Sequence, residues 1–241
     1  MRHYYLGWDV GGWNCDHNAA SRDALVFLDH QANLVGRAWR GNLREQINHA
    51  ASTAQWLASV FSLCEITLPE KPFHVTLAID TPLGFSTAFV QLITQSQPAE
   101  SIGASQQNPY LFRQTEHYLF ARGLKPLSPI KDMIGSQATK GIHFLAKFAP
   151  QVLAAGRWTD GELLTALEGY PSAAKRSEWM QHRYSGYPDL KNDDKNDALW
   201  CALLAFCVAQ YPEKIVFPFQ DTPSSEGWIF VPIDAFKISI P

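Results

Sequence analysis

The stretch Phe73-His74-Val75-Thr76-Leu77-Ala78-Ile79-Asp80 is a near-continuous apolar run that ends in a carboxylate. Runs of this kind are typical of strands that are buried on both faces of a sheet, because other elements cover each side. The run therefore predicts a central strand in a mixed α/β sheet with flanking helices. Its last residue, Asp80, would lie where this strand ends.

Three further strands are predicted upstream of this run. Residues 4–10 are apolar and aromatic and stop at Gly11-Gly12, whereas residues 24–29 and 34–40 flank a polar turn. Apolar segments bounded by glycines or by polar turns are the usual signature of strands. We expect these three strands to form an antiparallel meander at the start of the chain.

The remaining segments predict helices and two more strands. The helices would cover residues 44–64, 111–121, 136–155 and 194–210, and the strands would cover residues 163–170 and 228–232. We expect residues 1–241 to form one domain, since neither a repeat nor a low-complexity linker divides them. Residues from about 81 to 162 would be a helical insertion between two strands of that domain, beginning with a loop-rich stretch.

The composition excludes several classes of protein. Hydrophobic residues make up 46% of the 241 residues, enough for a substantial core, so the chain is not intrinsically disordered. Lys and Arg number 20 against 23 Asp and Glu, and this net charge of -3 argues against coating nucleic acid through bulk charge. The cysteines include no CxxC pair, so neither a zinc ribbon nor a thioredoxin-like site is indicated.

The N-terminal and apolar segments bear on location. The first residues lack the charged region, the apolar run and the small-residue cleavage site of a signal peptide. The longest near-apolar run, residues 198–209, is too short to span a bilayer. We therefore expect a cytoplasmic protein without a membrane partner, whose oligomeric state the sequence leaves open.

Carboxylates occupy three places where elements of the expected sheet meet. Asp9 ends the first strand between glycines, Asp80 ends the central strand, and Asp194 and Asp197 open the last long helix. Clustered anions are costly to bury without a partner, and a divalent cation such as Mg²⁺ removes that cost through oxygen ligands. Each Asp alone could instead be a turn former or a helix cap. Together they favour a metal site.

The order of these features resembles the RNase H-like superfamily, in which three antiparallel strands with an Asp on the first precede a helix and a parallel strand ending in an acid. More closely, the chain looks like the predicted RNase H-like nucleases of the domain of unknown function 429 family. The matching pieces, in family order, are Gly7-Trp8-Asp9, Ala78-Ile79-Asp80-Thr81-Pro82-Leu83-Gly84, Arg113-Gln114-Thr115-Glu116, Glu168-Gly169-Tyr170-Pro171-Ser172, Lys195-Asn196-Asp197-Ala198-Leu199 and Glu226-Gly227-Trp228-Ile229. The spacing of Asp194 and Asp197 before Ala-Leu is similar to the final motif of Holliday-junction resolvases.

The resemblance implies a metal-dependent nuclease that hydrolyses phosphodiester bonds with two ions, Mg²⁺ or Mn²⁺. Asp9 would bridge the ions, and Asp80 and Asp197 would each hold one. Asp194 or Glu168 would complete the shell, and water would be the nucleophile. The superfamily often has Glu where Asp80 stands, and no acid of the first helix is suitably placed. A resolvase-like arrangement is therefore favoured over cleavage of RNA–DNA hybrids.

The sequence allows two roles for Glu168 and two for Arg113. Glu168 follows an apolar strand, so it would be a fourth carboxylate of the same cleft, or a rim residue paired with Lys175 or Arg176. Arg113 would hold a phosphate of the substrate, for which its forked guanidinium is suited. Alternatively, it would form a surface ion pair with Glu116, one helical turn away.

Other basic residues offer contacts to phosphate. Lys195, between Asp194 and Asp197, would steady the scissile phosphate or neutralise these acids. Residues 113–147 contain six basic side chains and only two acidic ones, so they form a solvated helical face or a surface that faces nucleic acid. The six are Arg113, Arg122, Lys125, Lys131, Lys140 and Lys147.

Three other functions stay open. A non-catalytic protein that binds nucleic acid or a nucleotide could keep the fold without the chemistry. An actin-like phosphotransferase relative shares the strand order and an N-terminal Asp with glycines, although that class normally duplicates the domain. Hydrolysis of a small nucleotide or phosphoester also suits the modest overall charge. The expected partner in most of these cases is a nucleic acid or a nucleotide.

Overall fold

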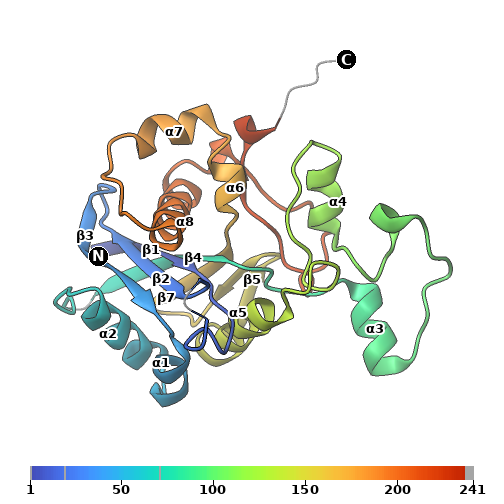
Figure 1. Ribbon diagram of the computed structural model, residues 1–241, viewed down its shortest axis with the longest axis horizontal. Helices are drawn as coiled ribbons and strands as arrows, with labels where there is room; N and C mark the ends of the chain where they lie inside the picture. The colour runs from blue at the N-terminus through green and yellow to red at the C-terminus, as the bar shows by residue number, and fades with distance from the viewer. Residues whose placement is uncertain (1, 19, 71, 237–241) are drawn as a thin grey trace.

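The computed structural model describes residues 2–18, 20–70 and 72–236. Within them, one mixed sheet has seven strands in the order β3-β2-β1-β4-β7-β6-β5 (Figure 1). The strands are β1 (Arg2–Asp9), β2 (Asp23–Leu28), β3 (Leu34–Gly41), β4 (Phe73–Asp80), β5 (Gln151–Ala154), β6 (Arg157–Thr159) and β7 (Leu164–Glu168). The first three are antiparallel neighbours, whereas β4 and β7 run parallel to β1. The predicted mixed α/β sheet is thereby confirmed.

Helices cover both faces of this sheet (Figure 1). They are α1 (Arg44–His49), α2 (Thr53–Leu63), α3 (Thr87–Gln95), α4 (Gln114–Phe120), α5 (Gly135–Phe148), α6 (Pro171–Ala174), α7 (Glu178–Tyr184) and α8 (Asp193–Gln210). Apolar side chains of α1, α2 and α5 pack on one face, and those of α6, α7 and α8 pack on the other. Strands β8 (Ile215–Val216) and β9 (Val231–Pro232) pair in a separate small sheet.

The alternation of side chains along β1 decides which of them meet each layer of helices. Trp8 points into the core under α2 and α5, whereas Tyr5 and Gly7 face α8, because successive strand residues point to opposite sides. Gly7 allows α8 to approach closely, since a Cβ at this position would lie 1.8 Å from Ala198 O. Asp9 continues the series of Tyr5 and Gly7, so it points toward the side of α8.

The helices differ from the sequence-based expectation at several places. The single helix expected over residues 44–64 is divided, because Ala50 has an extended conformation and Ser52 starts α2 by accepting a hydrogen bond from Gln55 N. Helix α5 ends at Phe148, and the next residues form β5 and extend the sheet. Helix α3 lies in a stretch that was expected to be loop, and α6 and α7 were not predicted.

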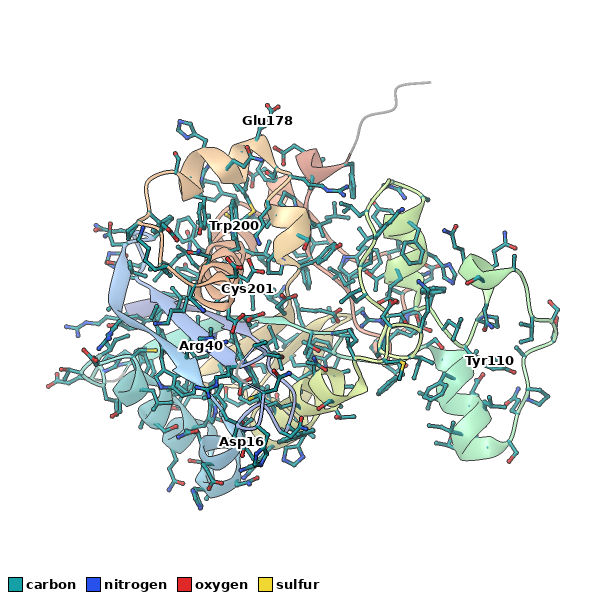
Figure 2. All side chains as sticks on the ribbon, viewed as in Figure 1. Asp16, Arg40, Tyr110, Glu178, Trp200 and Cys201 are labelled. Atoms are coloured by element: carbon teal, nitrogen blue, oxygen red, sulfur yellow. The ribbon has the colours of Figure 1, made fainter. Side chains whose placement is uncertain are left out.

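Helix α3 stands at one end of the molecule, away from the sheet (Figure 1). None of its residues is buried, and its Ile93 side chain is 62% exposed. Tyr110 lies in this part of the molecule (Figure 2). Its hydroxyl accepts a hydrogen bond from Ala99 N at 2.8 Å. Among the described helices, none is long and apolar enough to cross a membrane.

Candidate functional site

Asp9 and Asp80 lie side by side at the carboxyl ends of two neighbouring parallel strands. They are register partners in the β1–β4 pair, so both side chains leave the same face of the sheet. Both residues are partly buried, and no described residue donates a hydrogen bond to either carboxylate. The structure thus brings together the two acids that end the predicted strands, and leaves their oxygens available to a ligand.

The N-terminus of α8 brings two more carboxylates close to this pair. Asn192 caps the helix by accepting a backbone hydrogen bond at 3.2 Å, and Asp194 and Asp197 follow within the first two turns. Burial is the main cause that raises the pKa of Asp9 well above its usual range, and the charges of Asp80, Asp194 and Asp197 add to it. The four predicted acids are therefore close enough to repel one another.

The two acids of α8 have cationic partners. Arg40 of β3 donates from Nε to Asp194 Oδ2 at 2.6 Å, and Lys175 forms an ion pair with Asp197. Burial raises the pKa of Asp80 to about 7; the charge of Asp197 adds to this effect, whereas Lys175 opposes it. The charges of Asp194 and Asp197 are thus balanced by ion pairs, whereas Asp9 and Asp80 have no ion-pair partner among the described residues.

A cavity of about 400 Å³ opens beside the Asp9–Asp80 pair. The ends of β1, β4 and β7 line it together with the loop between α4 and α5. Thr81 is 4% exposed and lines this cavity, yet its Oγ1 has no hydrogen-bond partner in the described part of the chain. Lys125 is the one cationic side chain among the described residues that line it. The cavity therefore joins a carboxylate pair to a free hydroxyl and one positive charge.

Arg113 is buried, so the expected contact with a substrate phosphate is corrected. The side chain is 1% exposed, and a guanidinium has five N–H donors. Nε and Nη2 donate to Glu116 Oε1 at 2.8 and 2.5 Å, and Nη2 and Nη1 donate to Glu168 at 2.7 and 2.8 Å. The fifth donor meets the carbonyl oxygen of Glu226 at 2.9 Å. No donor is left for a ligand, and the ion pair with Glu116 is internal, not a surface pair.

Glu168 is likewise corrected as an open fourth carboxylate. It lines the cavity, but both of its oxygens bond to Arg113, and Oε2 also accepts from Leu83 N at 2.9 Å. Its register partner on β4 is Ile79, so its side chain leaves the opposite face of the sheet from Asp80. Burial raises the pKa of Glu168, and Arg113 opposes that rise. The partner is Arg113, and not Lys175 or Arg176.

Lys195 lies outside the cavity, which corrects its expected contact with the scissile phosphate. It lines a separate hollow with Arg37, Leu63 and Glu65, on the side of β3 and the end of α2. Residues three or four positions apart share one face of a helix, as Asp194 and Asp197 do. Lys195 is only one residue from Asp194 and two from Asp197, so its side chain lies on another face of α8.

The basic window 113–147 does not form one positive face. Lys140 is buried and bonds to Asp23 Oδ2 at 2.5 Å, and Lys147 donates to the carbonyl oxygen of Ile47 at 2.6 Å. The other members are also dispersed: Arg122 stacks on Tyr118, Lys131 pairs with Asp132, and Lys125 lines the cavity. These six described side chains therefore do not form the single basic face that either interpretation of the window requires.

Asp23 is a central residue that sequence reasoning missed. It is fully buried, and it accepts hydrogen bonds from Trp8 Nε1 at 2.9 Å, from Gly11 N at 3.0 Å and from Leu43 N at 2.7 Å. Together with Lys140 it fixes the loop that follows Asp9. One feature of the sequence could have indicated its role. Asp23 begins an otherwise apolar strand, and a charge buried there needs a partner of opposite charge from elsewhere in the chain.

Asp9 and Asp80 are the two carboxylates that remain available to a divalent cation. Within the described residues, no group of three or more His, Cys, Asp or Glu side chains is arranged to hold a metal ion. Asp9 and Asp80 nevertheless fit one hard cation, because Mg²⁺ is commonly held by one or two carboxylates together with waters and substrate phosphates. Asp197 would have to leave Lys175 to act as a ligand. The residues therefore fit one ion better than two.

Comparison of the chain with models of known protein families, with curated proteins and with solved structures gives no match. The resemblance to the RNase H-like superfamily and to the domain of unknown function 429 family therefore stays a prediction.

Proposed function

We propose that this protein is a metal-dependent phosphodiester hydrolase whose site is the Asp9–Asp80 pair. The observation that carries the proposal is the in-register pairing of two partly buried carboxylates that border a cavity and receive no hydrogen bond from the described residues. Buried negative charge without a donor is unfavourable by itself, so the arrangement suits a cation. The strand order, with Asp residues on β1, β4 and α8, supports an RNase H-like nuclease fold.

Each part of the site has a role in this proposal. Asp9 and Asp80 would hold one Mg²⁺ or Mn²⁺ ion, which supplies charge stabilisation and activates water. Lys125 would neutralise the phosphate of the substrate, and Thr81 Oγ1 would donate to one of its oxygens. A second ion at Asp197, with Asp194 in support, remains part of the prediction and requires their ion pairs to open.

The decisive experiment compares Asp9→Asn with wild type on single-stranded, duplex and branched DNA, on RNA and on small phosphodiesters. Wild type should cut at least one substrate with Mn²⁺ and none with EDTA, and Asp9→Asn should be inactive. Asp221→Asn is a matched control, because Asp221 is exposed and lies outside the cavity. The proposal fails if no substrate is cut, or if Asp9→Asn cuts as fast as wild type.

A second candidate is a non-catalytic protein that binds nucleic acid or a nucleotide. The ion pairs of Asp194 with Arg40 and of Asp197 with Lys175 favour it, because they occupy two of the expected ligands. Titration calorimetry with Mn²⁺ separates the candidates. A hydrolase should bind Mn²⁺ and lose it in Asp80→Asn, whereas a non-catalytic protein should bind none.

A further inference from the structure

The cavity beside Asp9 and Asp80 is lined by two kinds of side chain. Leu127, Ile134 and Ile229 contribute aliphatic side chains, and Pro82 and Pro126 contribute their rings. The other kind can donate or accept hydrogen bonds, namely Thr81, Lys125, Gln137, Tyr170 and Ser172. This combination suits a ligand with one flat apolar group and one anionic group.

The volume limits the size of that ligand. Pockets for small molecules range over about 300–1,000 Å³, so a cavity of about 400 Å³ lies at the small end. A single nucleobase with its sugar and phosphate is of this size class, and a stacked duplex is not. The cavity therefore selects for a small unit of nucleic acid, not for a long segment.

The buried hydroxyl of Thr81 is an independent sign of a ligand. Buried polar side-chain atoms nearly always have a hydrogen-bond partner. Thr81 Oγ1 lacks one within the described residues, although the residue is only 4% exposed and lines the cavity next to Asp80. A phosphate oxygen at the carboxylate end of the cavity would give this hydroxyl its partner.

The distribution of positive charge argues against a long substrate. Proteins that follow a nucleic-acid backbone need several cations along it, because each phosphate contact is largely electrostatic. Two of the six basic residues of the window 113–147, Arg113 and Lys140, are buried in ion pairs, and Lys147 donates hydrogen bonds to main-chain carbonyl groups. Lys125 therefore provides positive charge for one phosphate. The other five basic residues of the window do not continue from it as a row of cations.

We infer that the cavity binds a single nucleotide unit, with its phosphate at the Asp9–Asp80 end and its base against the aliphatic side chains of Leu127, Ile134 and Ile229. This inference rests on the proposed function and names its substrate class. The substrate would be the nucleotide at the end of a strand, joined to its neighbour by the phosphodiester bond that is cut, and not an internal segment of a duplex.

The base-binding part can be tested without metal. Adenosine is titrated into the full chain in EDTA, with wild type, Leu127→Trp and Leu68→Trp compared by calorimetry. Leu127 is 55% exposed and lines the cavity, whereas Leu68 is 48% exposed and lies outside it, so both changes should leave the fold intact. We expect Leu127→Trp to weaken adenosine binding at least about tenfold, because the indole fills the cavity, and Leu68→Trp to have no effect.

The phosphate-binding part is tested with adenosine monophosphate and ribose 5-phosphate in Mn²⁺. Lys125→Gln should weaken both ligands about tenfold, because each loses the same charge-assisted contact. Leu127→Trp should weaken only adenosine monophosphate, because ribose 5-phosphate has no base. Lys131→Gln is the control, since Lys131 pairs with Asp132 outside the cavity.

The substrate arm compares a linear single strand with the same strand closed into a circle. End-directed cleavage should consume the linear strand and leave the circle intact. The inference is overturned if adenosine monophosphate binds no tighter than ribose 5-phosphate, or if the circle is cut as fast as the linear strand. Cutting of the circle would still support the proposed hydrolase. Conversely, adenosine binding without any Mn²⁺ binding would keep the nucleotide site and refute the proposed hydrolase.

Discussion

Arg113 shows how completely a buried arginine can be committed to structure. Its five N–H donors meet Glu116, Glu168 and the carbonyl oxygen of Glu226, which belong to three separate parts of the chain. The bonds tie the start of α4 to the end of β7 and to the segment before β9. The residue therefore holds the insertion on the sheet next to the cavity and has no N–H group left for a ligand.

Replacement of Arg113 should cost stability. Arg113→Ala leaves Glu116 and Glu168 buried without their cation, and breaking a buried ion pair costs ~3–5 kcal/mol. Arg113→Lys should recover only part of this loss, because a lysine cannot bond to two carboxylates in the bidentate manner. Urea unfolding followed by circular dichroism measures the change in the free energy of unfolding.

Arg37→Ala is the control for this measurement. Arg37 forms an exposed ion pair with Glu65 at 3.2 Å, and pairs of this kind contribute little to stability. Equal unfolding midpoints for Arg113→Ala and Arg37→Ala would contradict the structural role of Arg113 and would reopen the question of a ligand contact.

At the scale of elements, the packing of α8 on β1 brings the acids together. Gly7, Ala198 and Ala202 face one another, and these small residues let the helix approach the strand closely. Asp9 lies two residues beyond Gly7, and Asp197 directly precedes Ala198, so the distance between strand and helix also sets the distance between the acids. The geometry of the site thus depends on the contact between two elements.

Gly7→Ala should separate these elements. The new methyl group would lie 1.8 Å from Ala198 O and 2.4 Å from Ala202 N, so backbone atoms must move. Overpacking of this kind costs about 1–3 kcal/mol, and the displacement of α8 should also weaken Mn²⁺ binding. Urea unfolding and calorimetry measure the two effects.

Gly186→Ala is the matched control, because a Cβ there would have Arg183 O as its nearest neighbour at 3.5 Å, an ordinary contact. Its stability should be close to that of wild type. If Gly7→Ala were as stable as Gly186→Ala, the close packing of α8 on β1 would not determine the geometry of the acids.

At the scale of the whole molecule, the acidic cluster makes stability depend on pH. Burial raises the pKa of Asp80 from its usual value of 3.8 to about 7, so the folded protein holds a proton that the unfolded chain releases. The resulting stabilisation is fully present below about pH 4 and is lost as the pH rises through about 7. The small net charge of -3 therefore does not reveal how strongly the stability depends on the ionisation of Asp80.

Thermal unfolding between about pH 4 and pH 8 tests this dependence. The Tm of wild type, relative to that of Asp80→Asn, should fall as the pH rises through this range, because only wild type gains a charge at position 80. At about pH 8, Mn²⁺ should raise the Tm of wild type and leave that of Asp80→Asn unchanged. Parallel Tm curves for the two proteins would show that Asp80 titrates normally.

Local patterns in the sequence determined the central strands and the acids at their ends. The apolar run that ends at Asp80 and the aromatic run that ends at Asp9 need only nearby residues to specify strands, and parallel pairing then places their ends together. Two of the missed helices, α6 and α7, have four and seven residues, which is too short for periodicity to stand out. Helix α3 does have apolar residues at helical spacing, namely Phe89, Leu92 and Ile93, but the loop-rich composition around it outweighed them.

Only the tertiary structure decided which charges are partners. Arg113 and Glu168 are 55 residues apart in the sequence, and Lys140 and Asp23 are 117 apart, so no local pattern links them. The sequence does not indicate whether a charged side chain is solvated or buried, because packing determines which residue becomes its partner. For that reason the sequence alone predicted Asp9 and Asp80 of the proposed site. The fold places Arg113 and Glu168 in a buried ion pair and Lys195 beside a separate hollow, and it adds a cavity lined by Thr81 and Lys125.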